Sequence, residues 1–374
     1  MFMQGRKIDK ITIKGFKSIR ELVDFELRDL NVIVGANGAG KSNFIQVFKM
    51  VHAMAMKGFQ EFITKAGGSD AFPYDGLKVT PTIDVGFVFG SNSYRFSLTP
   101  TADEKFVIQE DRRYQENNWK SYGSGLLESR LQDEKGEESC AYPGSPGVGH
   151  FVYNSISQWT VYHFHDTSST SPMRRSEIIE DNERLRNTGS NIAPFLFGLK
   201  TGDAIQSESY RHIVEAIRLV APYFDDFRLD PKLAGLTAKI LLSWRQRGSD
   251  YPFQSYHLSD GTIRFICLAT ALLQPNPPSL IVLDEPELGL HPLAITILAE
   301  MIKHAAKHTQ VIVATQSPQL IDQFGVEDLI VAKRENGAST FERLNEIDFK
   351  TWLEDYSLGE LWQKNIIAGG PTCE

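Results

Sequence analysis

The chain has 374 residues, 41% of them hydrophobic and 11% aromatic, which is enough for one large domain or two of ordinary size with a buried core. Its 47 acidic residues outnumber its 39 lysines and arginines, so the formal net charge is −8. This balance argues against a protein that mainly coats nucleic acid, although a local basic patch stays compatible with it. The N-terminus has no apolar signal core, and no stretch approaches the roughly 20 apolar residues of a membrane span, so we expect a cytoplasmic protein with no membrane partner.

The three cysteines, Cys140, Cys267 and Cys373, are widely spaced. Their spacing fits neither a zinc site nor a disulfide framework. We therefore expect three reduced thiols in a cytosolic protein.

A buried strand, a glycine-rich turn and a helix are predicted near the N-terminus. Residues 8–34 alternate apolar and polar side chains and predict short strands, the last of them at 30–34. From Lys41 to Met56 the apolar residues recur at helical spacing. Between them, residues 35–42 read GANGAGKS, which fits the phosphate-binding pattern G-x-x-x-x-G-K-[ST]. A glycine-rich turn that happens to precede Lys-Ser is the alternative, and the flanking strand and helix disfavour it.

The residue types of this turn suit a nucleotide. Glycines let backbone N–H groups surround phosphates at a positive helix N-terminus. Lys41 can reach the β- and γ-phosphates of ATP, and the Ser42 hydroxyl is a ligand for Mg²⁺. The residues expected to bind nucleotide here are Asn37, Gly38, Ala39, Gly40, Lys41, Ser42 and Asn43.

The middle of the chain predicts additions to this core. Residues 79–110 alternate as antiparallel hairpins do, and residues 133–149, charged and then rich in Gly and Pro, predict a mobile surface loop. A polar stretch at 166–191 leads into helical segments, and the order from 237 to 332 is strand, turn, helix, strand, helix, strand. No long repeat and no sustained heptad run is visible, so a long coiled-coil arm is excluded.

The C-terminal half contains a capped helix start and an acidic strand end. The sequence HLSDGT at 257–262 opens an amphipathic helix, with Ser259 as an N-cap whose hydroxyl and flanking amides can meet an anion. Residues 279–286 (SLIVLDEP) predict an apolar strand that ends in two carboxylates. Beside a phosphate loop, Asp284 would lie near Mg²⁺, and Glu285 would orient or deprotonate the attacking water. A simple helix cap and a solvated acidic turn are the alternatives.

The turn at 257–262, at its position before the acidic pair, resembles the signature of ABC ATPases, usually written LSGGQ. In that family the signature contacts the γ-phosphate held by a second protomer. The resemblance therefore implies a homodimer with ATP at its interface, and nucleotide contacts by Ser259 and Gly261. Residues 287–292 (ELGLHP) look like the D-loop of the same family.

Gln316 follows the next buried strand, at a position where many of these relatives carry histidine. A glutamine can hydrogen-bond the γ-phosphate or the attacking water, but it cannot carry a proton's charge. We therefore expect Gln316 to take part in catalysis and hydrolysis to be slow or conditional. The alternative is that Gln316 only caps the following turn.

The family's Q-loop has two candidate positions. Gln158 precedes an apolar segment, and His163, His165 and Asp166 form a polar cluster just after it. Two histidines two residues apart indicate a metal only weakly, and a core or turn role is the more common one for such a pair.

The opening at residues 11–19, ITIKGFKSI, followed by LNVIVGANGAGKSN, resembles ATPases of the SMC/RecF/OLD-like branch. Further matches are HFHDTS at 163–168, SNIAPFL at 190–196 and YSLGELWQKNIIAGGP at 356–371. Together they look like the stand-alone predicted-ATPase group of ABC-type AAA proteins. OLD-type relatives continue into a Toprim nuclease, and only a short tail follows here, so the resemblance implies that any effector is a separate chain.

The resulting fold prediction is an α/β, ABC-type P-loop NTPase head with a mixed β-sheet, an added antiparallel β lobe and a helical lobe. We expect a single head over 1–374, with an N-terminal lobe at 1–160 that holds the phosphate loop and β insertion. A helical lobe at 161–236 precedes a C-terminal lobe at 237–374 that holds the signature, the acidic pair and the D-loop.

The leading functional hypothesis is a dimeric ATPase that gates a DNA transaction or an anti-phage defence response, with a separate nuclease or toxin as effector. This role rests on family analogy. One alternative is a scaffold or sensor in which ATP is structural and turnover is negligible. A transporter cassette is a third hypothesis, and the N-terminal resemblance and the insertion at 79–110 disfavour it. The basic pairs Arg112-Arg113 and Arg174-Arg175, with Arg184 and Arg186 nearby, either contact DNA phosphates or are solvated loop charges.

Overall fold

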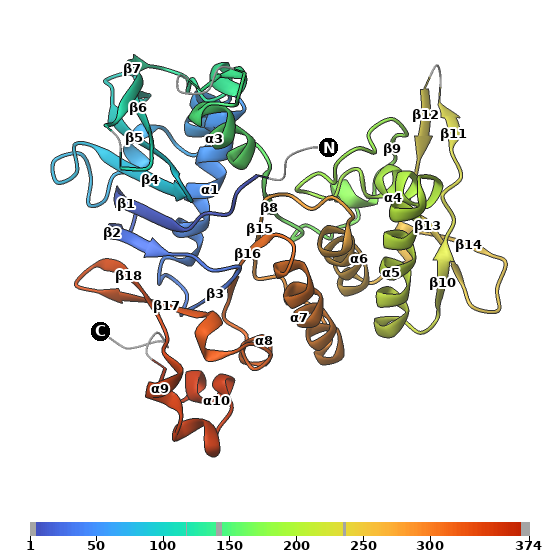
Figure 1. The fold of residues 1–374 in the computed structure, drawn as a ribbon. Coiled ribbons are helices and arrows are strands. Elements are labelled where there is room, and N and C mark those ends of the chain that lie inside the picture. Colours follow the sequence, from blue (N-terminus) through green and yellow to red (C-terminus); the bar gives the residue numbers. More distant parts are fainter. Residues whose placement is uncertain (1–4, 117, 140–143, 235–236, 368–374) are drawn as a thin grey trace. The chain divides into compact units, whose positions relative to one another are not determined.

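The computed structural model describes residues 5–116, 118–139, 144–234 and 237–367. Its contacts divide the chain into two compact units, which we describe one at a time (Figure 1). Unit 1 contains Met1–Val161, Pro278–Val282 and Thr309–Glu374, and unit 2 contains Tyr162–Pro277 and Leu283–His308. The three consecutive lobes expected from the sequence stay a prediction. The two units group the chain differently, because each unit is assembled from segments that are distant in sequence.

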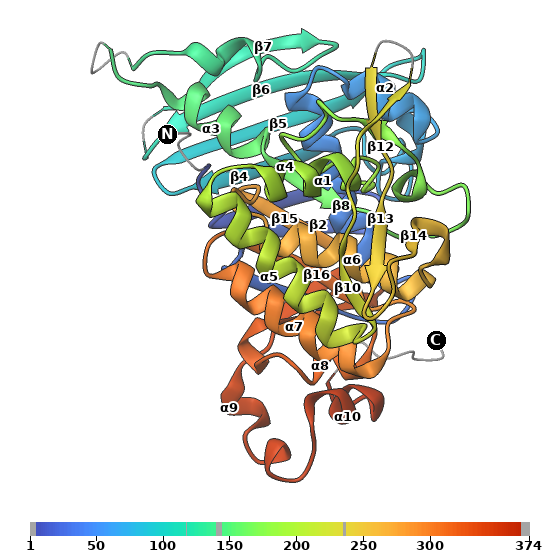
Figure 2. The same ribbon diagram turned by 90° about the vertical axis from the view of Figure 1, so that its right-hand side faces the viewer.

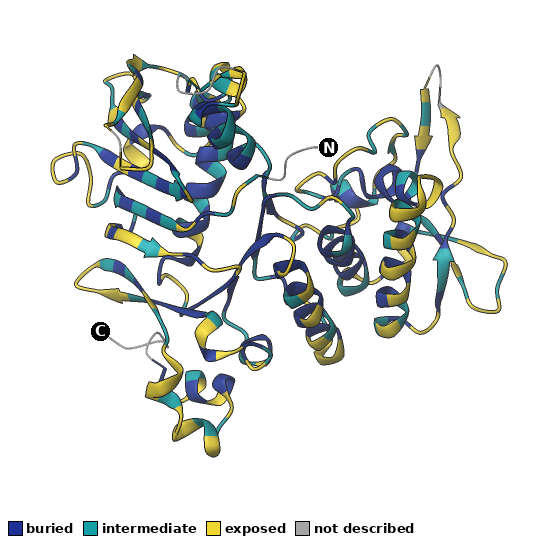
Figure 3. Cartoon of the chain, viewed as in Figure 1, coloured by how far each residue is buried: buried dark blue, intermediate teal, exposed yellow. Residues whose placement is uncertain are grey.

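Unit 1 carries an antiparallel sheet with strand order β2-β1-β4-β5-β6-β7. Its strands are β1 (Lys10–Phe16), β2 (Ile19–Glu26), β4 (Ile83–Phe89), β5 (Asn92–Pro100), β6 (Phe106–Tyr114) and β7 (Lys120–Leu126). Buried residues alternate with more exposed ones along β4, because successive side chains of a strand point to opposite faces (Figure 3). The antiparallel hairpins predicted at 79–110 are confirmed.

A second sheet has the strand order β18-β17-β3-β16-β15-β8. Its strands are β3 (Leu30–Val34), β8 (Trp159–Tyr162), β15 (Leu280–Asp284), β16 (Gln310–Thr315), β17 (Leu329–Glu335) and β18 (Ala338–Arg343). β16 and β17 run parallel to β3, whereas β18 pairs antiparallel with β17, so the sheet is mixed as predicted. Every residue of β3 is buried, as expected for a strand covered on both faces.

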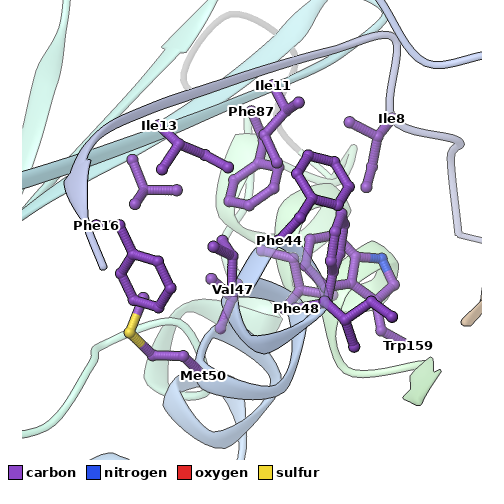
Figure 4. Packing of buried hydrophobic residues seen from close by; sticks show 14 of the residues in the cluster. Ile8, Ile11, Ile13, Phe16, Phe44, Val47, Phe48, Met50, Phe87 and Trp159 are labelled. Carbon is purple, nitrogen blue, oxygen red and sulfur yellow. The ribbon is translucent and has the colours of Figure 1, made fainter. Parts of the chain in front are cut away.

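The core of unit 1 holds the helix that starts at the phosphate loop. Helix α1 (Lys41–Ala55) buries Phe44 and Phe48 in a cluster of apolar side chains (Figure 4). The ring centroids of Phe48 and Trp159 lie 5.6 Å apart, and those of Phe87 and Trp159 lie 5.2 Å apart. Such an aromatic pair contributes about 0.5–1.5 kcal/mol beyond the burial of its area. This packing fixes the position of the N-terminus of α1.

The rest of unit 1 consists of short helical elements. Its α-helices are α2 (Phe59–Lys65), α3 (Val148–Ile156), α8 (Pro318–Ile321), α9 (Glu346–Phe349) and α10 (Leu358–Gln363). Its 3₁₀ turns are Ser69–Ala71, Asp133–Gly136, Val326–Asp328 and Trp352–Glu354. The surface loop predicted at 133–149 contains a 3₁₀ turn at its start, and its C-terminal bound is wrong because α3 begins at Val148. Residues 140–143 of it lie outside the described residues.

Unit 2 is built around the helices α4 (Ile192–Thr201), α5 (Ala204–Val220), α6 (Asp260–Leu273) and α7 (Pro292–Ala306). Helix α5 packs against α4, α6 and α7, and α6 also packs against α7 (Figure 2). A capping box starts α5, since Asp203 accepts a hydrogen bond from the Gln206 backbone and Gln206 accepts one from the Asp203 backbone. The helical segments predicted after residue 191 are confirmed.

Two three-stranded sheets accompany these helices, in the orders β10-β13-β14 and β11-β12-β9. Their strands are β9 (Glu177–Ile178), β10 (Phe224–Phe227), β11 (Lys232–Ala234), β12 (Thr237–Ile240), β13 (Ser243–Gln246) and β14 (Pro252–Gln254). The 3₁₀ turns of unit 2 are Pro172–Arg174 and Ser255–His257, and the second of them leads directly toward α6.

Two absences and one cysteine bear on the sequence predictions. Among the described residues, none of the helices has the length and apolarity needed to cross a membrane. The same residues contain no cluster of three or more His, Cys, Asp or Glu side chains suited to a metal ion. Cys267 is a buried free thiol, and burial raises its pKa to about 12. Cys140 and Cys373 lie outside the described residues.

Candidate active site

In unit 1 the phosphate loop connects β3 to α1, in the context predicted for it. Gly38 and Gly40 have φ values of 82° and 108°, a region that favours glycine. A Cβ added at Gly40 would overlap the Ser339 hydroxyl, and one added at Gly35 would overlap the carbonyl oxygen of Ala332. The loop therefore needs glycine for its backbone path and also for its close approach to the β17-β18 hairpin.

The side chain of Lys41 folds back against the phosphate loop. Its Nζ donates hydrogen bonds to the carbonyl oxygens of Gly35, at 2.6 Å, and Ala36, at 3.0 Å. Lys41 is only 5% exposed, whereas Asn37, Gly38 and Ser42 are exposed. An ammonium held inside a glycine loop, with an exposed hydroxyl next to it, fits a phosphate chain with its magnesium ion.

Two serine hydroxyls, of Ser18 and Ser339, form hydrogen bonds next to the phosphate loop. Ser18 Oγ accepts a hydrogen bond from Asn43 Nδ2 at 2.7 Å and one from Ser339 Oγ, also at 2.7 Å. The Ser339 backbone N–H donates to the Ser18 carbonyl. Asn43, expected to bind nucleotide, therefore uses its amide to tie the start of α1 to Ser18. Ser18 and Ser339 were missed by the sequence reasoning, because contacts across hundreds of residues leave no local pattern.

Gln316 lies in the same unit as the phosphate loop. In the parallel pairing of β16 with β3, Thr315 stands opposite Val34, so Gln316 leaves its strand where Gly35 leaves the neighbouring one. Helix α8 is capped by Ser317, whose Oγ accepts from the Leu320 backbone N–H at 3.4 Å. The N-cap of that helix is thus Ser317, and a catalytic role for Gln316 stays a prediction. The register brings Gln316 and the phosphate loop to the same edge of the sheet.

In unit 2 the acidic pair adjoins a small pocket. β15 ends at Asp284, and Glu285 follows with a φ of 43°, an uncommon value for a residue other than glycine. Non-glycine residues in this region carry strain and cluster at functional sites. The pocket is lined by Tyr162, Phe164, His165, Arg264, Leu268, Leu283, Asp284, Glu285 and Pro286.

This pocket bears on the two Q-loop candidates. His165 lines it together with the acidic pair, and the His163 and His165 rings lie 4.5 Å apart. Gln158 belongs to unit 1, in the turn between α3 and β8. The cluster at 163–166 is thus the candidate that the structure brings next to Asp284 and Glu285 within one unit.

The signature turn forms the N-terminus of α6. Ser259 is the N-cap, and its Oγ accepts from the Thr262 backbone N–H at 3.1 Å. The predicted cap is confirmed, and contact with nucleotide stays a prediction. A Cβ added at Gly261 would overlap the carbonyl oxygen of Gly289, so the signature turn lies directly against the segment predicted as the D-loop.

Two buried arginines hold this region, and the sequence reasoning missed both roles. Arg174, with a side chain 6% exposed, donates to the carbonyl of Leu258 and pairs with Asp260 at 2.9 Å. Arg264 donates from Nε to the Phe164 carbonyl at 3.0 Å and from Nη2 to the His165 carbonyl at 3.1 Å. The sequence does contain one indication of this role for Arg264, because it is a cation among the apolar residues of a helix.

The interpretation of the basic pairs needs correction. Arg174 is neither a DNA-facing residue nor a solvated loop charge, because its guanidinium is buried against the signature turn. Arg112 pairs with Glu137, and its guanidinium stacks 4.0 Å from the Tyr122 ring centroid. Arg186 pairs with Asp181 at 2.8 Å. These partners lower the number of cations available to bind DNA.

Two solved structures share the fold of this chain. The chain is similar to an SMC head bound to the C-winged-helix domain of ScpA, with a TM-score of 0.56, 16% identity, and 92% of this chain and 99% of that one covered. It is also similar to the SMC head domain with an extended coiled coil bound to the C-terminal domain of ScpA from Pyrococcus furiosus, with a TM-score of 0.54, 17% identity, and 93% and 98% covered. The fold is therefore that of an ABC-type P-loop ATPase head of the SMC kind, as predicted.

The sequence identifies the family within this class. Residues 30–322 match the family described as "AAA domain, putative AbiEii toxin, Type IV TA system", and the match spans most of the chain. The chain belongs to this family. A search of curated proteins finds no match to it.

Proposed function

We propose that the chain binds ATP with Mg²⁺ and hydrolyses it. The observation that carries this proposal is the phosphate loop, in which Lys41 lies inside a glycine turn that tolerates no added Cβ at Gly35 or Gly40. In this function Asn37 to Asn43 surround the phosphates, with the backbone N–H groups of the loop as donors. Family membership supports it, because a P-loop AAA domain is a nucleotide-binding domain.

The roles of the remaining residues follow from their chemistry. The Ser42 hydroxyl and the Asp284 carboxylate are the groups that would hold Mg²⁺, and the ion would supply positive charge to the phosphate oxygens. Glu285 accepts a proton from the attacking water, and Gln316 hydrogen-bonds that water or the γ-phosphate. His165, which lines the pocket of the acidic pair, takes the place of the Q-loop residue.

The proposed assembly is a homodimer. Ser259 and Gly261 at the N-terminus of α6 offer backbone N–H groups and a positive helix end to the γ-phosphate held by a second copy. Helix α6 is long enough, at 14 residues, to carry a full helix dipole. Each ATP would then be bound by the phosphate loop of one copy and the signature turn of the other.

The proposed biological role is control of a separate effector in a defence response or DNA transaction. The family description, with its putative AbiEii toxin and type IV toxin–antitoxin system, supports a defence role. The similar SMC heads are each bound to a domain of ScpA, which supports a head that works with another protein chain. Within this role the chain supplies an ATPase head of the SMC/RecF/OLD-like branch, and its effector is a nuclease or toxin.

One observation favours a second candidate function, a scaffold that binds ATP with negligible turnover. Gln316 occupies the edge of the sheet beside the phosphate loop, and a neutral amide cannot stabilise developing charge as a protonated histidine can. Lys41, Asp284 and Glu285, all present, favour the hydrolysing enzyme.

The test compares the wild-type chain with Glu285→Gln. The amide keeps the shape of the side chain and removes the proton acceptor, so we expect ATP turnover to fall about 10²–10⁴-fold while ATP binding is retained. The closed dimer should accumulate with ATP, which light scattering detects as a doubled mass. Glu300→Gln, at an exposed position of α7, is the matched control and should leave turnover unchanged. Equal turnover in Glu285→Gln and wild type would remove Glu285 from the base role, and a wild-type chain that binds ATP without turnover would favour the scaffold.

A further inference from the structure

Arg264 connects three segments of unit 2 that carry candidate functional residues. Its Nε and Nη2 donate to the carbonyls of Phe164 and His165, and its Nη1 donates to the carbonyl of Leu288. Arg264 belongs to α6, the helix whose N-cap is Ser259. One side chain thus joins the signature helix, the segment at 163–166 and the segment at 287–292, which we call the D-loop segment.

The contact between the signature turn and the D-loop segment is also tight at the backbone. A Cβ at Gly261 would overlap the Gly289 carbonyl oxygen, and one at Gly289 would lie 3.1 Å from Arg264 Nη1. Gly289 has a φ of 72°, which suits glycine. Two glycines and one arginine therefore make a single close-packed contact.

The chemistry of this contact requires arginine. A guanidinium presents donors in a rigid planar fork, so it can satisfy three carbonyls that lie in different directions, whereas an ammonium is a compact point charge on a flexible stem. Arg264 is 9% exposed, and burial lowers its pKa from the usual value. The three hydrogen bonds to backbone carbonyls offset the cost of burying this charge.

We propose that Arg264 is a positioning residue that makes the signature turn, the D-loop segment and the His165 segment move as one body. Engagement of ATP by the signature turn then sets the position of the acidic pair, because Asp284 and Glu285 line the same pocket as Arg264 and directly precede the D-loop segment. This inference deepens the proposed function and rests on it: Arg264 regulates when a closed dimer hydrolyses its ATP.

Arg174 provides the matched comparison. It is also a buried arginine that holds the signature turn through backbone carbonyls, at Ser255 and Leu258, and it pairs with Asp260. Its Nε donates to the carbonyl of Thr167, next to the segment at 163–166, but none of its hydrogen bonds among the described residues reaches the D-loop segment. Weakening the contacts of Arg174 should therefore weaken ATP binding by the signature turn. Weakening the contacts of Arg264 should instead slow the hydrolysis of ATP that is already bound.

The experiment compares Arg264→Lys with Arg174→Lys in steady-state hydrolysis. We expect Arg264→Lys to lower kcat at least tenfold at saturating ATP, with the dimer fully formed by light scattering. Arg174→Lys should instead raise KM and keep kcat within about twofold of wild type. Wild-type kcat in Arg264→Lys, or an equal loss of kcat in both variants, would overturn the proposal.

A second variant tests the same contact independently, in case Arg264→Lys does not fold. Gly289→Ala places a methyl group against Arg264 from the other side of the same contact. Because both substitutions break one contact, the double variant should lose much less kcat than the product of the two single losses. A multiplicative loss would show that Arg264 and the D-loop segment act independently.

Hydrogen exchange in the absence of nucleotide separates this inference from the proposed function. We expect Arg264→Lys to speed exchange of the backbone amides at 163–166 and 287–292, and Arg174→Lys to speed it at 255–262 but not at 287–292. A chain without ATPase activity would contradict the proposed function, yet this pattern would still establish that Arg264 joins the three segments. Unchanged exchange at 287–292 in Arg264→Lys would overturn the inference by itself.

Discussion

The phosphate loop of unit 1 and the signature region of unit 2 are held in their conformations by opposite means. In unit 1 the loop depends on missing side chains, since Gly35 and Gly40 leave no room for a Cβ, and one lysine satisfies the loop carbonyls. In unit 2 the signature region depends on long side chains, since Arg174 donates to the Leu258 carbonyl of the turn and Arg264 reaches from α6 to the Phe164 carbonyl. The phosphate loop therefore has a pattern that is visible in its own residues, although it packs on a distant hairpin. The signature region is held by arginine contacts across 84 and 100 residues, which leave no such pattern.

This difference predicts that the two regions fail in different ways. A change in the phosphate loop should abolish nucleotide binding in a single chain. A change in the signature region should leave that binding intact and affect only the steps that need a second copy. The substitutions below test this contrast in order of expected effect.

Lys41→Ala should have the largest effect on binding. It removes the cation that the phosphate loop offers to the β- and γ-phosphates, so we expect ATP affinity to fall at least tenfold, which corresponds to about 1.4 kcal/mol. Titration calorimetry measures the loss. Lys49→Ala, at a position in the same helix away from the loop, is the control. Wild-type affinity in Lys41→Ala would mean that the phosphate-loop assignment is mistaken.

Gly40→Ala should destabilise the fold more than Gly38→Ala. Both glycines have positive φ, so both substitutions carry backbone strain, but only a Cβ at Gly40 overlaps the Ser339 hydroxyl, and nothing lies within 4 Å of a Cβ at Gly38. We expect the free energy of unfolding to differ between the variants by about 1–3 kcal/mol, measured by urea denaturation. Equal stabilities would show that the hairpin does not constrain the loop.

Gln316→His should have the smallest effect. An imidazole can occupy the same edge of the sheet and stabilise charge on the γ-phosphate, so we expect an unchanged melting temperature and a modest rise in turnover. A tenfold or greater loss of rate, equivalent to about 1.4 kcal/mol, would show that the amide itself is required.

The contrast between the regions also explains what the sequence could predict. The phosphate loop, the acidic strand and the cap at Ser259 were recognisable because each depends on neighbours in sequence. Lys41 could be assigned from the glycines that precede it, and Asp284 from the apolar run that it ends. The fold class followed from the same motifs, because strands and helices around them alternate in a fixed order.

The remaining features depend on contacts that no local pattern reports. Ser18 and Ser339 meet across 321 residues, and Arg264 meets Phe164 across 100. Arg174, next to another arginine in a polar stretch, has the appearance of a surface charge until its partners are known. The grouping of the chain into two units has the same origin, because residues 278–282 and 309–374 return to the unit of the N-terminus.

In the proposed dimer, each ATP is shared by two copies of the chain. Ser259→Arg should leave ATP binding intact and abolish hydrolysis, because a long side chain fills the space of the γ-phosphate contact, while Ser259→Ala reports the loss of the helix cap alone, about 1 kcal/mol. Lys41→Ala should be inactive for the opposite reason.

The decisive measurement is the ATPase rate after the Ser259→Arg and Lys41→Ala chains are mixed. Each heterodimer then has one complete site, with the phosphate loop of the first chain and the signature turn of the second, so the account predicts partial recovery of hydrolysis where either chain alone has none. No recovery in a mixture in which mass measurements demonstrate heterodimers, or normal hydrolysis by Ser259→Arg alone, would contradict the account.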